Sequence, residues 1–428
     1  MRLREVKTLY EVTSRLMTTT NANYGERKKS KLRFNEYYNT QELFDKLYER
    51  SKKGHKLKNF LEIIASRENI LLAYRTIKKN TGSKTKGVNN TTIEDIAEWG
   101  TNKLVNYVRN RLEYYVPQPV RRVYIPKPDG RKRPLGIPTM EDRIIQQCIK
   151  QVLEPICEAK FHKHSYGFRP NRSTKYAIAR CMYLANSSFH YTVDVDIKGF
   201  FDNVDQGKLL KQLWSLGIQD KNLISILSRL LKAEIKGEGK PSKGTPQGGI
   251  ISPLLANVVL NELDWWISNQ WETFGTKKKY SNQGNRITSQ KQLTKLKQMF
   301  MVRYADDFKI FCKSYESASK IKIAVSKWLK ERLNLEVSKK KTKVTNLKNK
   351  YSEFLGIKFK VIKKSKGYVC KSKICDKTKK KIVYKLKRQI KEIKKHTNAR
   401  CLSSKLSHLI KFFFKYSSLK SPITRSVG

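Results

Sequence analysis

Residues 300–311 place the tightest constraint on how this chain folds, because they read as two apolar strands joined by a very short turn. The turn carries two adjacent carboxylates, Asp306 and Asp307. Adjacent aspartates at a turn usually reflect turn chemistry alone. A functional interpretation therefore requires a second acidic cluster elsewhere in the chain.

Such a cluster lies in residues 191–202, where Asp194 and Asp196 alternate with valine and isoleucine. This alternation is typical of a strand with one buried face. Carboxylates from two different strands are the oxygen ligands that a pair of Mg²⁺ ions requires. The pattern predicts a two-metal site, where one ion activates a hydroxyl and the other steadies a pyrophosphate leaving group.

A glycine-rich segment, residues 243–257, follows the second cluster and reads as a turn that opens an amphipathic helix. It lacks the Lys-Ser/Thr ending of a phosphate-binding P-loop, so ATPase chemistry is disfavoured. Glycine lets a nucleotide or a template strand approach the backbone closely. We therefore expect this segment to line a substrate site.

The charge of the chain identifies its class of partner. Lys and Arg number 91 and Asp and Glu number 36, so the net charge is +55 and a polyanion is the default partner. Hydrophobic residues make up 39%, which is enough for most of the chain to fold. The 7 cysteines form no C-x-x-C pair, and no apolar run is long enough for a membrane span.

The remaining pattern predicts helices and strands in alternation. We expect helices at about 40–51, 57–79 and 141–158, and a lysine-rich helix from about 377. A capping box of Thr91 with Glu94 should open a further helix. Residues 120–137 should form a strand–turn–strand hairpin with a basic tip. Beyond residue 190, strands alternate with helices, which indicates an α/β or α+β domain.

Seven blocks of sequence, in order, resemble the reverse transcriptases encoded by group II introns, the maturase-type proteins. The blocks are 133–138 with Asp142 and Arg143, 164–172, 196–202, 244–249, 304–307, 341–342 and 354–357. The similarity covers about residues 55–365 and is weak beyond them.

The resemblance implies an α+β right-hand polymerase with fingers, a palm of antiparallel sheet plus helices, and a partial helical thumb. The implied divisions are a basic N-terminal extension at 1–54, fingers at 55–185, palm at 186–360 with insertions, and a partial thumb or maturase X region at 361–428. The thumb is expected to be about half as long as in similar proteins, and we find no C-terminal endonuclease block.

The resemblance also implies roles for individual residues. Asp196 and Asp306 would be the principal ligands of two Mg²⁺ ions, with Asp307 as the neighbouring acidic member and the carbonyl of Ile197 as an extra oxygen. The deoxynucleoside triphosphate would be bound by Lys127, Arg133, Phe201, Gln247 and Lys341.

Among these residues, Phe201 is expected to exclude a 2′-hydroxyl by steric collision, and Lys341 is a candidate proton donor to pyrophosphate. His164, Phe168, Arg169 and Arg172 are expected to brace the fingers, with contact to a template or primer backbone as the alternative.

The implied function is RNA-directed DNA polymerase of a group II intron, which copies RNA into cDNA by two-metal nucleotidyl transfer, with binding of the intron RNA and assistance in its splicing. The expected partners are an RNA template, the parental intron RNA, a DNA primer or target and dNTPs, with no membrane and with a homodimer left open. A bacterial cytoplasm is the expected compartment, and an organelle matrix is the alternative. The competing functions are an RNA-binding splicing cofactor with little or no polymerase activity, and an RNA-copying RNA polymerase.

Overall fold

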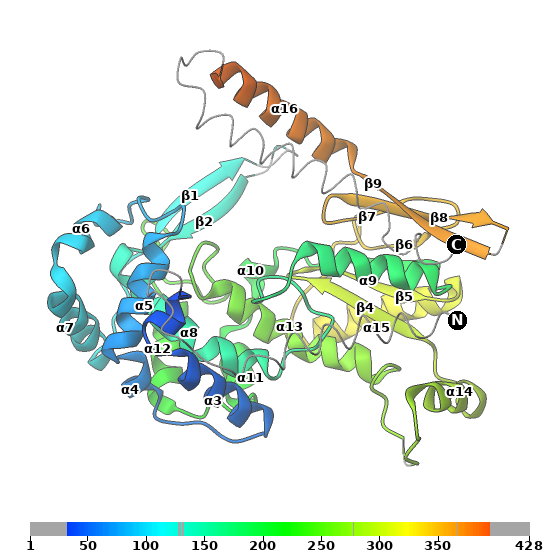
Figure 1. The fold of residues 1–428 in the computed structure, drawn as a ribbon, viewed down its shortest axis with the longest axis horizontal. Helices are drawn as coiled ribbons and strands as arrows, with labels where there is room; N and C mark the ends of the chain where they lie inside the picture. The colour runs from blue at the N-terminus through cyan, green and yellow to red at the C-terminus, as the bar shows by residue number, and fades with distance from the viewer. Residues whose placement is uncertain (1–31, 127–129, 131, 277, 366, 394–428) are drawn as a thin grey trace.

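The computed structural model describes residues 32–126, 130, 132–276, 278–365 and 367–393 of the chain. Within these ranges, helices fill most of the first half of the sequence, and antiparallel strands with flanking helices form the second half (Figure 1). The combination of helices and antiparallel sheets confirms the predicted α+β class.

Helix α8 (Met140–Glu158) forms the centre of the helical half, because nearly all of its residues are buried and it packs against four neighbouring helices and α13. The other helices of this half are α2 (Phe34–Tyr37), α3 (Gln41–Lys52), α4 (Phe60–Ile64), α5 (Arg67–Lys78), α6 (Ile93–Glu98), α7 (Gly100–Glu113) and α9 (Thr174–Asn186).

Two helix starts differ from the prediction. The stretch 57–79 forms two helices, α4 and α5, because Ser66 accepts a hydrogen bond from the backbone N–H of Asn69 and caps a new helix. The capping box lies one residue later than predicted, since the backbone N–H of Thr92 donates to the carboxylate of Asp95.

The hairpin of β1 (Arg121–Pro126) and β2 (Lys132–Ile137) projects from the helical half. Its basic tip was predicted from residues that include Lys127 and Arg131, and both lie outside the described ranges. The described part of the hairpin still places Arg133 at the end nearer the tip.

A four-stranded antiparallel sheet lies in the second half, with strand order β4-β5-β3-β6. Its strands are β3 (Tyr191–Asp196), β4 (Met299–Tyr304), β5 (Asp307–Cys312) and β6 (Lys343–Asn346). One face packs against α13 and α15, and its residues belong to the larger core; the other face packs against α9 and belongs to a second, smaller core. The helices of this half are α10 (Phe200–Asn203), α11 (Gln206–Ser215), α12 (Lys221–Leu231), α13 (Ser252–Asn269), α14 (Gln283–Leu293) and α15 (Tyr315–Leu333).

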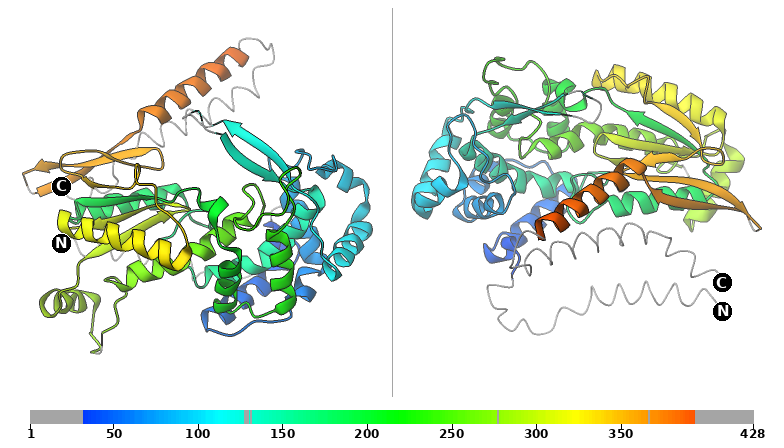
Figure 2. Two further views of the ribbon diagram at one scale, coloured as in Figure 1. Left: turned by 180° about the vertical axis from the view of Figure 1, so that it is seen from behind. Right: turned by 90° about the horizontal axis from the view of Figure 1, so that it is seen from above.

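A second antiparallel sheet closes the smaller core. It consists of β7 (Ser352–Phe354), β8 (Ile357–Lys364) and β9 (Gly367–Ile374), and α16 (Asp376–Ile393) follows it directly. Helix α16 extends from the end of β9 toward the side on which the β1–β2 hairpin projects (Figure 2). Because β8 runs across the division expected at residue 360, we propose that this sheet belongs with the palm and that the thumb begins at α16.

None of the helices in the described ranges combines the length and the apolar character that a membrane crossing demands.

Candidate active site

The two acidic clusters meet at one edge of the four-stranded sheet. Asp196 is the last residue of β3, and in the β3–β5 pairing it lies opposite Asp307, the first residue of β5. Asp306 occupies the two-residue turn between β4 and β5, where Ala305 has a φ of 59°. Hairpins favour such a positive φ, because it matches the twist of the strands. The turn therefore presents Asp306 beside the end of β3.

Arg303 anchors this turn from inside the protein. Its guanidinium donates to both carboxylate oxygens of Asp264 on α13, at 2.7 and 2.6 Å, and both side chains are only 1% exposed. A third bond runs from Arg303 to the backbone carbonyl of Ala305, at 2.8 Å. Because the partners are rigid and buried, this bidentate pair fixes where the turn lies relative to α13.

The loop at 162–173 braces the turn from the other side. The backbone N–H of Tyr166 donates to the carbonyl of Arg303, and the N–H of Arg303 donates to the carbonyl of His164. A Cβ atom at Gly167 would lie 2.3 Å from the backbone nitrogen of Ala305, so no larger residue fits. The loop therefore braces strand β4 as well, while Phe168 lines the cavity described below.

The glycine-rich segment packs against the hairpin and α10. A Cβ at Gly248, whose φ is +114°, would lie 2.5 Å from the carbonyl oxygen of Gly136 on β2. The N–H of Gly136 in turn donates to the carbonyl of Gln247 at 2.6 Å. The amide of Gln247 donates to Asp202 at 3.2 Å, and these contacts together hold Gln247 beside the end of β3.

A cavity of about 370 Å³ opens where β2, the glycine-rich segment, β3 and the β4–β5 turn meet. Its lining includes seven of the predicted site residues, namely Arg133, Asp196, Ile197, Phe201, Gln247, Asp306 and Lys341. Asp307 lies opposite Asp196 in the sheet but is not part of this lining. Lys127 lies outside the described residues.

The carboxylates of this edge repel each other. Burial raises the pKa of Asp306 above its usual value, and the negative charge of Asp196 raises it further. Burial also raises the pKa of Asp307, to about 6, although nearby Lys309 opposes the shift. The ammonium of Lys341 lies 3.0 Å from a carboxylate oxygen of Asp196. Cations are therefore the complementary ligands of this edge.

Asp194, the other aspartate of β3, has a different partner. It accepts from the buried ammonium of Lys309, which also donates to the hydroxyl of Ser352 on β7. This ion pair joins the two sheets and faces the smaller core. The sequence pattern did not reveal it, because Lys309 lies in an otherwise apolar strand and its partner is set by the sheet pairing.

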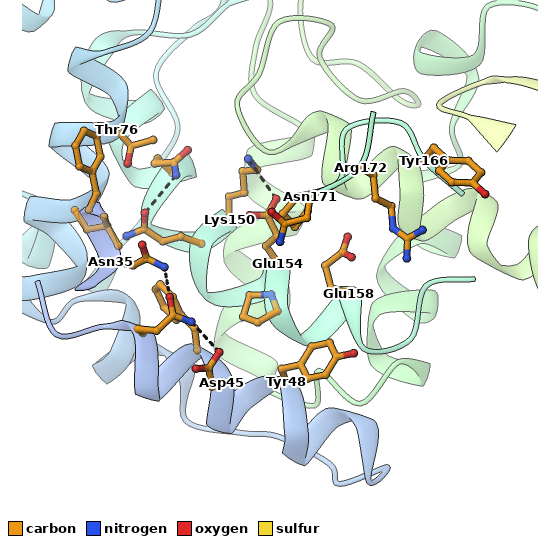
Figure 3. A pocket seen from close by; sticks show the side chains of 18 of the residues that line it. Asn35, Asp45, Tyr48, Thr76, Lys150, Glu154, Glu158, Tyr166, Asn171 and Arg172 are labelled. Atoms are coloured by element: carbon orange, nitrogen blue, oxygen red, sulfur yellow. Dashed lines mark hydrogen bonds and ion pairs between the residues drawn. The ribbon is translucent and has the colours of Figure 1, made fainter. Parts of the chain in front are cut away.

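A larger cavity of about 870 Å³ lies away from the two aspartates, between α3, α5, α8 and the 162–173 loop (Figure 3). Several of its charged side chains already have partners. Lys150 pairs with Glu154 at 3.5 Å, and Glu158 pairs with Arg169 at 2.8 Å. This cavity lacks the acidic strand ends, so the smaller cavity is the better candidate for chemistry.

A buried histidine in the bracing loop should make stability depend on pH. His162 is 0% exposed, and burial lowers its pKa to about 3. Below about pH 6.5 the unfolded chain takes up a proton that the folded chain excludes, so stability falls by about 1.4 kcal/mol per pH unit. Between pH 6.5 and 5, the free energy of unfolding in urea should therefore fall by about 2 kcal/mol less in His162→Asn than in wild type. The matched control is His55→Asn at an exposed site, and equal pH slopes for wild type and His162→Asn would contradict this account.

Known proteins resemble this chain over the segment that carries the cavity. The sequence model of the family described as "Reverse transcriptase (RNA-dependent DNA polymerase)" matches residues 125–359. Group II intron-encoded protein LtrA of Lactococcus lactis subsp. cremoris is 34% identical over 331 residues, which cover 68% of this chain and 54% of LtrA. Protein YkfC of Escherichia coli (strain K12) is 32% identical, with 70% and 82% covered.

Among solved structures, a chain of the partial Cas6-RT-Cas1–Cas2 complex matches with a TM-score of 0.36 at 22% identity, over 64% of this chain and 42% of that chain. The match to LtrA covers 54% of that protein, so this chain spans about half the length of LtrA.

Proposed function

The chain belongs to the reverse transcriptase (RNA-dependent DNA polymerase) family, in its group II intron-encoded, maturase-type branch, and from that premise we propose that it copies RNA into DNA. Its fold is the right-hand polymerase fold of that family. One observation carries the proposal. Asp196 and Asp306, which are distant in sequence, line a single cavity together with Arg133, Phe201 and Gln247.

The residues present fit a pair of divalent cations, which reverse transcriptases generally use. Among the described residues, no ready-made cluster of three or more His, Cys, Asp and Glu side chains surrounds one point. Mg²⁺ fits this situation, because it is commonly held by one or two carboxylates together with substrate phosphates. Asp196, Asp306, Asp307 and the carbonyl of Ile197 would hold two Mg²⁺ ions. When bound, such ions activate a hydroxyl nucleophile and neutralise the leaving pyrophosphate.

The other residues of the cavity would position the nucleotide. Arg133 supplies a guanidinium that suits a triphosphate, and Lys127 belongs to the same fingertip in sequence. Gln247 and Phe201 line the same cavity, where Gln247 would contact the nucleotide and Phe201 would lie against its sugar. Lys341 would release Asp196 and donate a proton to the leaving pyrophosphate. Catalysis would therefore rest on positioning and charge, with no covalent intermediate.

Primer extension tests this proposal directly. A DNA primer annealed to an RNA template, with Mg²⁺ and dNTPs at low salt, should be extended by the wild-type protein. Extension should stop when EDTA removes the metal and should be poor with rNTPs. If the folded protein binds the RNA but extends no primer, the splicing-cofactor alternative takes its place.

We expect Phe201 to control the choice of sugar. Its half-buried ring lines the cavity and packs edge-on against the buried ring of Phe200, so it cannot easily move away. Overpacking of this kind costs about 1 to 3 kcal/mol, so Phe201→Val should raise rNTP relative to dNTP incorporation by roughly 10- to 100-fold. Phe201→Tyr keeps the bulk and is the matched control. Unchanged discrimination in Phe201→Val would remove this role.

The partners follow from the same proposal. The cavity would receive dNTPs and a DNA primer end paired to an RNA template, and the net charge of +55 favours additional RNA, here the parental group II intron RNA. Binding of that RNA could assist its splicing. The pair Asp196 and Asp306 favours a polymerase over a pure splicing cofactor. A splicing cofactor has no need of carboxylates that repel each other beside a nucleotide-sized cavity.

A further inference from the structure

The sheet β7–β9 has two chemically different faces. The inner face carries Phe354, Phe359 and Val361, which are each at most 2% exposed and pack into the smaller core. The outer face, on the opposite side of the same strands, carries four lysines, namely Lys358, Lys360, Lys371 and Lys373. Together with Tyr351, these four residues are called the lysine face below.

The four lysines lie directly opposite one another as like-charged pairs. In the β8–β9 register, Lys358 pairs with Lys373 and Lys360 pairs with Lys371. Like charges directly opposite in an antiparallel pair are destabilising, so this arrangement costs the fold stability. Strand neighbours two residues apart are about 7 Å apart, so the four ammonium groups form one compact patch.

Few acidic residues offset this charge. Lys358 pairs with Asp376 at 2.5 Å, at the start of α16. Within the part of the chain that the structure describes, Lys360, Lys371 and Lys373 have no carboxylate within ion-pair distance. Glu353 lies opposite Lys358 on the same face and is the one acidic residue of the strands there.

Tyr351 holds three of the ammonium groups over one ring. The centroid of its ring lies 4.6 Å from the Nζ of Lys373, 5.3 Å from that of Lys360 and 6.0 Å from that of Lys358. At the other end of the sheet, Lys348 lies 4.4 Å from the ring of Tyr368. Lysines interleaved with tyrosines are typical of surfaces that contact nucleic acid.

We propose that the lysine face is a second RNA-binding surface, which contacts the phosphate backbone of RNA outside the template–primer cavity. This inference rests on the proposed function for the identity of the polyanion. The carboxylates that would bind the two Mg²⁺ ions lie at the edge of the four-stranded sheet, whereas the lysine face is turned away from the core between the two sheets. Bound phosphates would remove the repulsion that the fold otherwise carries.

The test is the variant Lys360→Gln/Lys371→Gln/Lys373→Gln, in the full chain. The matched control is Lys320→Gln/Lys327→Gln/Lys330→Gln, which removes the same charge from exposed positions on α15, on the other side of the four-stranded sheet. Two probes are used: a structured group II intron transcript for binding, and a short RNA–DNA template–primer for extension.

We expect the lysine-face variant to bind the intron transcript roughly 10- to 100-fold more weakly at 0.15 M salt, with the salt slope of binding reduced by about 2 to 3. The α15 control should stay near wild type. Extension of the short template–primer should change by less than about twofold. The variant's Tm should equal or exceed that of wild type, because the like-charge pairs are gone.

Three results would overturn the proposal. One is unchanged transcript binding, another is an equal loss in the α15 control, and a third is a matching loss of extension on the short template–primer. If the glutamine variant binds the transcript like wild type but loses binding to phosphatidylserine vesicles, the lysine face binds a membrane surface and not RNA.

A separate variant covers the case of impaired folding. Lys360→Arg/Lys371→Arg/Lys373→Arg keeps the charge and should retain transcript binding. The two proposals can fail separately. If the wild-type protein extends no primer but the glutamine variant still loses transcript binding, the polymerase proposal is wrong and the RNA-binding proposal for the lysine face holds.

Discussion

Asp306→Asn should slow primer extension on an RNA template by about 10³-fold or more. The carboxylate would hold a divalent cation, and such ions supply several kcal/mol of transition-state stabilisation. An amide lacks the charge that this requires. Folding should be preserved, because the substitution removes a carboxylate whose pKa is already raised by burial and by the charge of Asp196. Single-turnover extension with Mg²⁺ and dNTPs measures the effect.

The control for this experiment is Glu331→Gln, which removes one exposed carboxylate on α15 and should leave the rate near that of wild type. RNA binding by Asp306→Asn should stay within about twofold of wild type, since the residue contributes no positive charge. Extension by Asp306→Asn at the wild-type rate would show that this carboxylate holds no catalytic metal.

Arg303→Met should cost about 3 to 5 kcal/mol of the free energy of unfolding, measured in urea. The substitution leaves the carboxylate of Asp264 buried without its partner, and both side chains are 1% exposed in the native protein. It also removes the donor to the carbonyl of Ala305, in the turn that carries Asp306. Stability and activity should therefore both fall.

A double variant separates these two effects. In Arg303→Met/Asp264→Leu the whole ion pair is replaced by apolar residues, which is often close to neutral for stability. We expect most of the lost stability to return, whereas extension should stay impaired because the carbonyl of Ala305 still lacks its donor. A loss of less than about 1 kcal/mol in the single variant would mean that the buried pair is not needed.

The fold was predictable where a local pattern decides the element. The β1–β2 and β4–β5 hairpins follow from strand-like runs joined by short turns. The strand that ends at Asp196 follows from alternation, and α8 follows from helical spacing. The break between α4 and α5 was missed because the apolar stripe continues through it, while the cap at Ser66 depends on one side-chain hydrogen bond.

The candidate site was predictable only in part, for a related reason. Asp196, Asp306 and Gln247 were found from their motifs, and their roles remain predictions. Arg303 was missed because its partners, Asp264 and Asn257, come from a helix whose position no local pattern gives. The pairing of Asp194 with Lys309 likewise depends on which strands become neighbours. Contacts between distant segments are set by the packing of the whole sheet.

Gly167 shows how little freedom the β4–β5 turn beside the two aspartates leaves to sequence change. Even one methyl group there would overlap the backbone nitrogen of Ala305, at 2.3 Å. The neighbouring residue on the loop, Phe168, lines the cavity of about 370 Å³ that the aspartates also line. A larger residue at this position would have to push the turn aside, and Asp306 would move with it. Glycine at 167 therefore fixes the distance between the loop and the turn that carries this aspartate.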